Sequence, residues 1–161
     1  MIVMILWLVG ACASAQPEAL DGDTRAELSA RAAARAYGSS CLSGAIFVRD
    51  ELFYSDTLEG DEEAMPELTR AALVDLFDEI EFVDRDAADE LTGGGEGMAR
   101  GVLVSLSPAD VLAEGVVGVD VGVVRPLDGY RAETMLFMWD GSSWIDATSE
   151  DTGVTVTSAV S

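Results

Sequence analysis

Apolar residues recur at helical spacing in two segments of the amino-terminal half of the chain. The first segment follows Thr24-Arg-Ala-Glu27, which fits a helix capping box, and Gly38 is placed to end the helix. In the second, Pro66 suits a first helical turn, and one face is apolar: Leu68, Ala72, Leu73, Leu76, Phe77 and Ile80. The pattern predicts two helices, with a short strand or helix extension at 45–48 and a brief strand at 81–84.

From residue 100 onward the pattern changes to the alternation of strands. It predicts strands over 102–106, 116–124, 130–139 and 143–148, a single helical turn at 107–110 and an edge strand at 154–156. The Asp-Gly pairs at 128–129 and 140–141 are strong hairpin signals, because type I′ turns need positive φ at both central residues. The expected fold class is α+β, with two N-terminal helices packed on a C-terminal antiparallel β-meander of about four strands.

Register in the first predicted hairpin decides which side chains share a face. If Asp128-Gly129 is a two-residue turn, Leu127 pairs with Tyr130 and side chains alternate between faces from there. One face then carries a core set of Val117, Val119, Val121, Val123, Leu136 and Met138. The other face carries Gly118, Asp120, Gly122, Met135, Phe137 and Trp139, and a turn of two or four residues at 140–141 adds Trp144.

The second of these faces is the candidate site. A sheet face that contacts only solvent does not normally carry large apolar side chains, but this face carries Met135, Phe137, Trp139 and Trp144. Glycines on both sides of Asp120 leave room above the sheet, so we expect a ligand pocket or docking surface with Asp120 as its polar anchor. The alternative is that the first helix, or the segment 49–58, covers this face as a second core layer.

Composition and charge narrow the range of functions. The chain has 161 residues, enough for one domain, and its 49% apolar content is enough for a core. Thirty acidic and nine basic residues leave a net charge of −21, so we expect no nucleic acid partner and repulsion from anionic lipid headgroups. Histidine is absent, which removes Ser-His, Cys-His and His-metal chemistry. Without such a base, Cys41 is expected to be a small buried side chain rather than a nucleophile.

The acidic loops are weighed as metal sites. Carboxylate oxygens bind Ca²⁺, and loops at 56–63 and 84–90 would supply them, but neither matches the EF-hand spacing. We therefore favour a solvated acidic surface and assign no metal ligand, no catalytic residue and no cofactor. A Ca²⁺-dependent surface scaffold remains an alternative.

The first residues carry a second kind of signal. An apolar run at 2–9 ends in Val9-Gly10-Ala11-Cys12, which resembles the lipobox of bacterial lipoproteins. A run of about eight residues suits a signal peptide and is shorter than the roughly 20 needed to cross a bilayer. The resemblance implies a signal peptide over 1–11, a lipid on Cys12, a tether over 12–22 and a single α+β domain over 23–161. Cleavage after Ala13-Ser14-Ala15 would instead give a secreted protein, and a cytosolic protein with a buried N-terminal strand is the third alternative.

These observations together predict a non-catalytic binding module of the cell envelope, lipid-anchored and facing outward. Its membrane contact is the N-terminal lipid, and its partner is an unidentified protein or small molecule. The order of helices and meander loosely resembles the cystatin-like and nuclear-transport-factor-like cone folds. That resemblance implies a small-ligand pocket with Asp120 inside the cone, whereas a small enzyme with Asp120 as general base would need a second polar group nearby.

Overall fold

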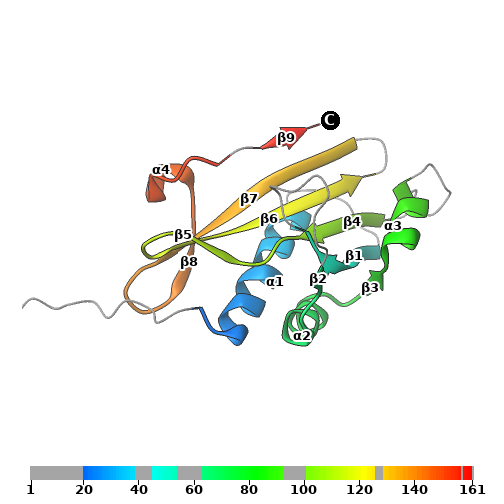
Figure 1. The fold of residues 1–161 in the computed structure, drawn as a ribbon, viewed down its shortest axis with the longest axis horizontal. Coiled ribbons are helices and arrows are strands. Elements are labelled where there is room, and N and C mark those ends of the chain that lie inside the picture. The colour runs from blue at the N-terminus through cyan, green and yellow to red at the C-terminus, as the bar shows by residue number, and fades with distance from the viewer. Residues whose placement is uncertain are drawn as a thin grey trace, which may run out of the picture.

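The computed structural model describes residues 20–38, 45–53, 63–92, 101–125, 129–156 and 158–160 (Figure 1). In chain order the elements are α1 (Gly22–Gly38), β1 (Ala45–Leu52), β2 (Glu63–Ala64), α2 (Glu67–Leu76), β3 (Ile80–Val83), α3 (Arg85–Thr92), β4 (Gly101–Leu106), β5 (Asp110–Ala113), β6 (Val116–Arg125), β7 (Gly129–Trp139), β8 (Trp144–Ala147), α4 (Ser149–Thr152) and β9 (Ala159–Val160).

The strands of these segments form one mixed sheet. Its main path runs β2-β1-β4-β6-β7-β8, with β3 paired to β1, β5 to β6 and β9 to β7. The β1–β3 and β1–β4 pairs are parallel, and the other pairs are antiparallel. A parallel unit, β3-β1-β4, is therefore joined through β4 to the antiparallel meander β6-β7-β8.

The expected arrangement of two N-terminal helices on a four-strand meander is wrong. A single helix precedes the sheet, because β1 and β2 come between α1 and α2. The parallel β1–β4 pair joins positions far apart in the chain, such as Ile46 and Val102. Local periodicity predicts a strand but says nothing about which distant strand it will pair with.

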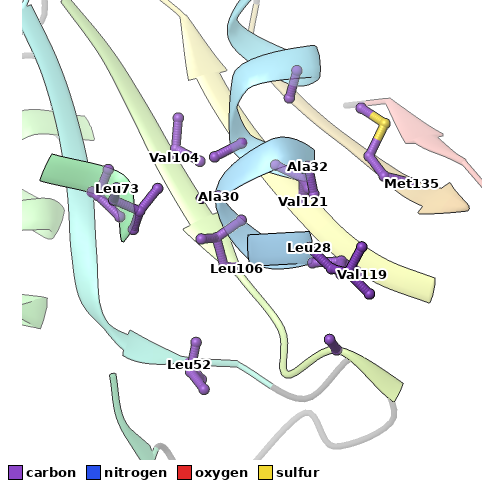
Figure 2. Close-up of a cluster of buried hydrophobic side chains, with 14 of the residues drawn as sticks. Leu28, Ala30, Ala32, Leu52, Leu73, Val104, Leu106, Val119, Val121 and Met135 are labelled. Carbon is purple, nitrogen blue, oxygen red and sulfur yellow. The ribbon is translucent and has the colours of Figure 1, made fainter. Parts of the chain in front are cut away.

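Helix α1 covers one face of the sheet, called the α1 face below. Asp21 caps the helix, since its Oδ1 accepts the Thr24 N–H at 2.7 Å, and that bond lowers the Asp21 pKa. The predicted helix is confirmed, but its cap is Asp21 rather than Thr24. Figure 2 shows Leu28 and Ala32 of α1 lying on the valines of β6. The alanines of α1 allow close approach to the sheet, and one buried cluster runs from β1 to β7 beneath them.

Two arginines fix α1 to the far strands of the sheet. Arg31 Nη2 lies 2.6 Å from Asp146 Oδ1, and Arg31 Nη1 donates to the Trp144 carbonyl oxygen at 2.8 Å. Arg35 Nη1 donates to the Leu136 carbonyl oxygen at 3.2 Å. Both guanidinium groups also lie over the ring of Phe137, at 5.1 and 5.7 Å from its centroid. These contacts join the helix to β7 and β8 through charge as well as apolar packing.

The opposite, outer face of the sheet has two separate small cores. Near β1 and β4, α3 packs its Ala88 against Val83 and Leu103. Near β6, β7 and β8, the chain after α4 packs Val154 and Val156 against a buried cluster of Val116, Leu136 and Ala147. The predicted edge strand at 154–156 is wrong, since these residues contribute apolar contacts without strand pairing.

The structure also differs from several local predictions. The segment 107–110 leads into strand β5 rather than forming a helical turn. The segment 84–90 is not a loop, because Asp84 caps α3 by accepting the Ala87 N–H at 2.9 Å. The second helix is confirmed as α2, but Phe77 ends it and Ile80 belongs to β3. Only Thr69 and Leu73 of α2 are buried, because α2 packs beside α1 rather than flat on the sheet.

Candidate functional site

The register of the first hairpin differs from the predicted one. Tyr130 pairs with Val124 instead of Leu127, and Arg125 pairs with Gly129, which leaves 126–128 as the connection. The shift is an odd number of residues, and an odd shift moves each side chain of one strand to the opposite face relative to its partner. The predicted grouping of Asp120 with the aromatic residues is therefore wrong.

The four aromatic and sulfur-containing candidates share a face of the sheet, but it is the α1 face. Met135 and Phe137 belong to the main core, and Trp144 packs against it. Trp139 contacts Trp144 edge to face, with ring centroids 5.6 Å apart. The structure agrees with the alternative prediction, in which the first helix covers these side chains as a core layer.

Asp120 lies on the outer face, opposite Thr134. Its Oδ1 accepts the Thr134 hydroxyl at 2.5 Å, and its backbone N–H donates to Ser107 Oγ at 2.8 Å. The space over the flanking glycines is filled, since a Cβ at Gly122 would come within 3.1 Å of the Tyr130 ring. Burial raises the Tyr130 pKa, and the negative charge of Asp120 raises it further. Asp120, Thr134 and Tyr130 thus form a partly exposed polar contact between strands, and side chains occupy the space that was expected to be open beside Asp120.

A hollow lies between α1 and α2. It has a volume of about 420 Å³, and its walls are Asp23, Ala26, Glu27, Ala30 and Arg31 of α1 with Leu68, Ala71, Ala72, Asp75 and Leu76 of α2. We call it the α1–α2 groove. Ala26 and Ala30 are buried and form the floor, whereas Leu68 and Leu76 keep 51% and 49% of their surface exposed. Half-exposed leucines of α2 beside a floor of small residues make a partly exposed apolar surface.

The spacing of residues on the two helices explains the groove. On α1 the lining positions repeat at intervals of three and four, which places them on one side of the helix. Alanine at Ala26 and Ala30 leaves room where larger side chains would fill the space between the helices. The helical spacing predicted one apolar face that includes Leu68 and Leu76, and the groove was not predicted. The signal available was the shortage of large side chains on α1 to cover that face.

The rim of the groove is acidic. Asp23 and Glu27 stand on α1, and Asp75 stands on α2. Arg31 is the basic lining residue, and it is held by Asp146 at 2.6 Å and by Glu27 at 3.4 Å. The rim therefore keeps an excess of negative charge around an apolar floor.

A second hollow of about 730 Å³ lies where α2 leads into β3. Its lining mixes apolar and acidic residues: Ala45, Val74, Phe77, Asp78, Glu79, Ile80, Glu81 and Phe82. Ala45 directly follows residues 39–44, which are outside the described part of the chain. No lining residue of the α1–α2 groove directly adjoins an undescribed segment, and we take this groove as the candidate site.

Other predicted features lie partly or wholly in segments that the structure does not describe. Cys12, Cys41, the tether up to Ala19 and most of the acidic loop at 56–63 lie in undescribed segments. Within the described ranges, no group of three or more cysteine or acidic side chains is placed to hold a metal ion. None of the helices in those ranges is long and apolar enough to cross a membrane.

Comparison with known proteins found no matching family model, no matching curated protein and no matching solved structure.

Proposed function

We propose that this protein is a non-catalytic binding module of the bacterial cell envelope, and that it holds its partner in the α1–α2 groove. The observation that carries the proposal is the pair of half-exposed leucines, Leu68 and Leu76, beside a floor of buried alanines. Exposed apolar surface lowers the solubility of a free protein, and a groove rimmed by polar residues is typical of a contact surface.

The chemistry of the chain favours binding over catalysis. The sequence contains no histidine, so the commonest general base is missing. Asp120, the carboxylate weighed as a base, is engaged by the Thr134 hydroxyl at 2.5 Å. The groove itself is lined by alanine, leucine and charged side chains without a nucleophile beside a base.

The envelope location rests on the lipobox-like Val9-Gly10-Ala11-Cys12. Helix α1 begins at Gly22, and Asp23 lies at the groove. The ten residue-to-residue steps from Cys12 to Gly22 would span at most about 35 Å if fully extended. A lipid on Cys12 would thus hold the groove close to the membrane, where the partner would also lie.

Photo-crosslinking in the native host tests the binding function. A photoreactive amino acid at Ala71 lies in the groove, and one at Val111 is a matched control because Val111 is 60% exposed on β5. We expect a discrete adduct from Ala71 that disappears when Leu68→Ser is added, and none from Val111. Equal adducts from both positions, or none from Ala71, would contradict a binding role for the groove.

The intact mass of the mature protein tests the anchor separately. We expect a mass that begins at Cys12 and carries acyl chains, from a detergent extract of host membranes. A soluble product beginning at Gln16 would replace anchoring by secretion and leave the binding role standing. An unprocessed product beginning at Met1 would overturn the envelope location.

A further inference from the structure

We infer that the groove's occupant is a basic amphipathic helix of another protein, an inference that rests on the proposed binding function. The first argument is one of size and shape. The lining runs from Asp23 to Arg31 on α1 and from Leu68 to Leu76 on α2, and each stretch rises about 12 Å. About two turns of a third helix match that length. A helix with apolar residues at intervals of three and four would present them to this floor.

The alanine floor lets such a helix approach closely. Ala26 and Ala30 are 4% exposed each, so they are packed from below and present only methyl groups to the groove. Leu68 and Leu76 stand on α2 at the two ends of its lining stretch. Large apolar side chains of the occupant would therefore fill the middle, between the two leucines and over the alanines.

The negative charge of the groove's rim determines which polar residues the occupant should carry. Asp23 and Asp75 offer carboxylates along the rim, and Glu27 adds a third that lies 3.4 Å from Arg31. The nearby arginines are already engaged: Arg25 lies 3.9 Å from Asp110, Arg31 lies 2.6 Å from Asp146, and Arg70 lies 3.3 Å from Asp50. The net charge of −21 adds a long-range attraction for a cationic partner. Lysine or arginine beside the apolar stripe would complement this rim.

The same charge disfavours other occupants. A second copy of this chain would bring the acidic rim of one groove against that of the other, because a two-fold interface uses the same patch twice. The chain's own apolar residues 2–9 lack basic residues altogether, since the first arginine is Arg25. An anionic membrane surface would be repelled by the rim.

Binding of designed peptides to the full chain with Cys12→Ser tests the inference. One peptide has leucines on one helical face and lysines on the other. A second replaces every lysine with glutamate. A third scrambles the first, so that its charge is unchanged and its apolar face is lost. We expect the first to shift the Leu68 and Leu76 methyl resonances and to bind at least about tenfold more tightly than the other two.

Matched variants localise the charge effect. The triple variant Asp23→Asn, Glu27→Gln, Asp75→Asn removes the rim, and Asp86→Asn, Asp89→Asn, Glu90→Gln removes equal charge from exposed positions of α3. We expect the rim variant to weaken the basic peptide about tenfold, and the α3 variant to weaken it by less than about twofold. Equal weakening by both would overturn a specific acidic rim.

The remaining outcomes separate the inference from the proposed function. Equal binding of the acidic and basic amphipathic peptides at Leu68 and Leu76 would overturn the basic occupant and leave the groove as a binding surface. Equal binding of the scrambled peptide would overturn recognition of an amphipathic helix. Methyl shifts that change on deletion of residues 2–9 would identify the chain's own segment as occupant. Concentration-dependent dimers with shifts at the same methyls would identify a second copy. A failure of all three peptides overturns the inference, whereas the Ala71 crosslink decides the proposed function.

Discussion

The two faces of the sheet are built from the same strands but differ in how they are packed. On the α1 face, side chains from β1, β4, β6 and β7 join α1 in one continuous core. On the outer face, two smaller cores are separated by the contact of Asp120, Thr134 and Tyr130. The difference indicates that α1 is held firmly from beneath, so its other side, which lines the groove, is as rigid as the proposed binding role requires.

Substitution of two leucines on β4 tests the two faces directly, and we expect the largest change in stability from this test. Leu106 is fully buried on the α1 face, and Leu103 is 3% exposed on the outer face. We expect Leu106→Ala to lower the free energy of unfolding by about 3–5 kcal/mol and Leu103→Ala by about 2–3 kcal/mol. The cavity left by Leu106 is enclosed by a large core, whereas the small cluster around Leu103 can collapse around the deletion.

Urea unfolding of both variants gives the measurement. The two substitutions remove the same atoms from the same strand, so each serves as the control for the other. A larger loss for Leu103→Ala would mean that the outer face, not the α1 face, dominates stability. The argument for a rigid α1 would then fail.

Much of the antiparallel part of this comparison was predictable from the sequence. The alternation of residues predicted β6, β7 and β8. Trp139 pairs with Trp144, so the turn at Asp140 is a four-residue connection, one of the two lengths that were predicted. The Asp140 N–H donates to the Ser143 carbonyl oxygen at 3.1 Å. Hydrogen bonds from Ser143 and Ser142 to its carboxylate lower the Asp140 pKa. Local turn chemistry was sufficient for this hairpin.

The first hairpin shows where that reasoning stops. Its turn was placed at Asp128-Gly129, but Gly129 already pairs with Arg125 at the start of β7. A turn signal locates a reversal to within a residue or two, while the assignment of faces needs the exact parity. Met135 and Phe137 were therefore grouped together correctly, but they were wrongly predicted to share a sheet face with Asp120.

The parallel part was not predictable by the same means. Pairing of β1 with β4, and the placing of α3 on the outer face, depend on contacts between distant segments. The groove depends on the packing of α2 against α1, which leaves Leu68 exposed although its spacing is typical of a core-facing residue. Tertiary packing decided these features against the local pattern.

The arginine contacts of α1 give a prediction of intermediate size. Arg31→Ala removes the ion pair to Asp146, the hydrogen bond to Trp144 and the contact with Phe137. We expect the free energy of unfolding to fall by about 1–2 kcal/mol. Charge-assisted hydrogen bonds stabilise a folded protein by more than this when buried, but the side chains of Arg31 and Asp146 are partly solvated, which weakens them. The urea midpoint should fall at low salt and at high salt alike, because packing on Phe137 is lost in both.

Arg131→Ala is the matched control for charge. It also removes one arginine, but its 2.9 Å pair to Glu133 joins neighbours on one strand and leaves Arg131 46% exposed. We expect a loss below about 0.5 kcal/mol. If both variants lose equal stability and salt restores both, general repulsion in this acidic chain would explain the effect, and the attachment of α1 to β8 would not.

The smallest expected effect concerns the polar contact on the outer face. Burial is the main cause of the raised Tyr130 pKa, and the charge of Asp120 is the second. A raised folded-state pKa means that stability present below the unfolded pKa, about 10, is lost as pH rises toward the folded value. We expect Asp120→Asn to lower the Tyr130 pKa part of the way to its ordinary value and to reduce this alkaline loss. Ultraviolet titration in a background of Tyr37→Phe and Tyr54→Phe isolates Tyr130. A complete return would mean that charge, not burial, governs the site. That result would identify the centre of the outer face as solvated surface and would sharpen its contrast with the closed core beneath α1.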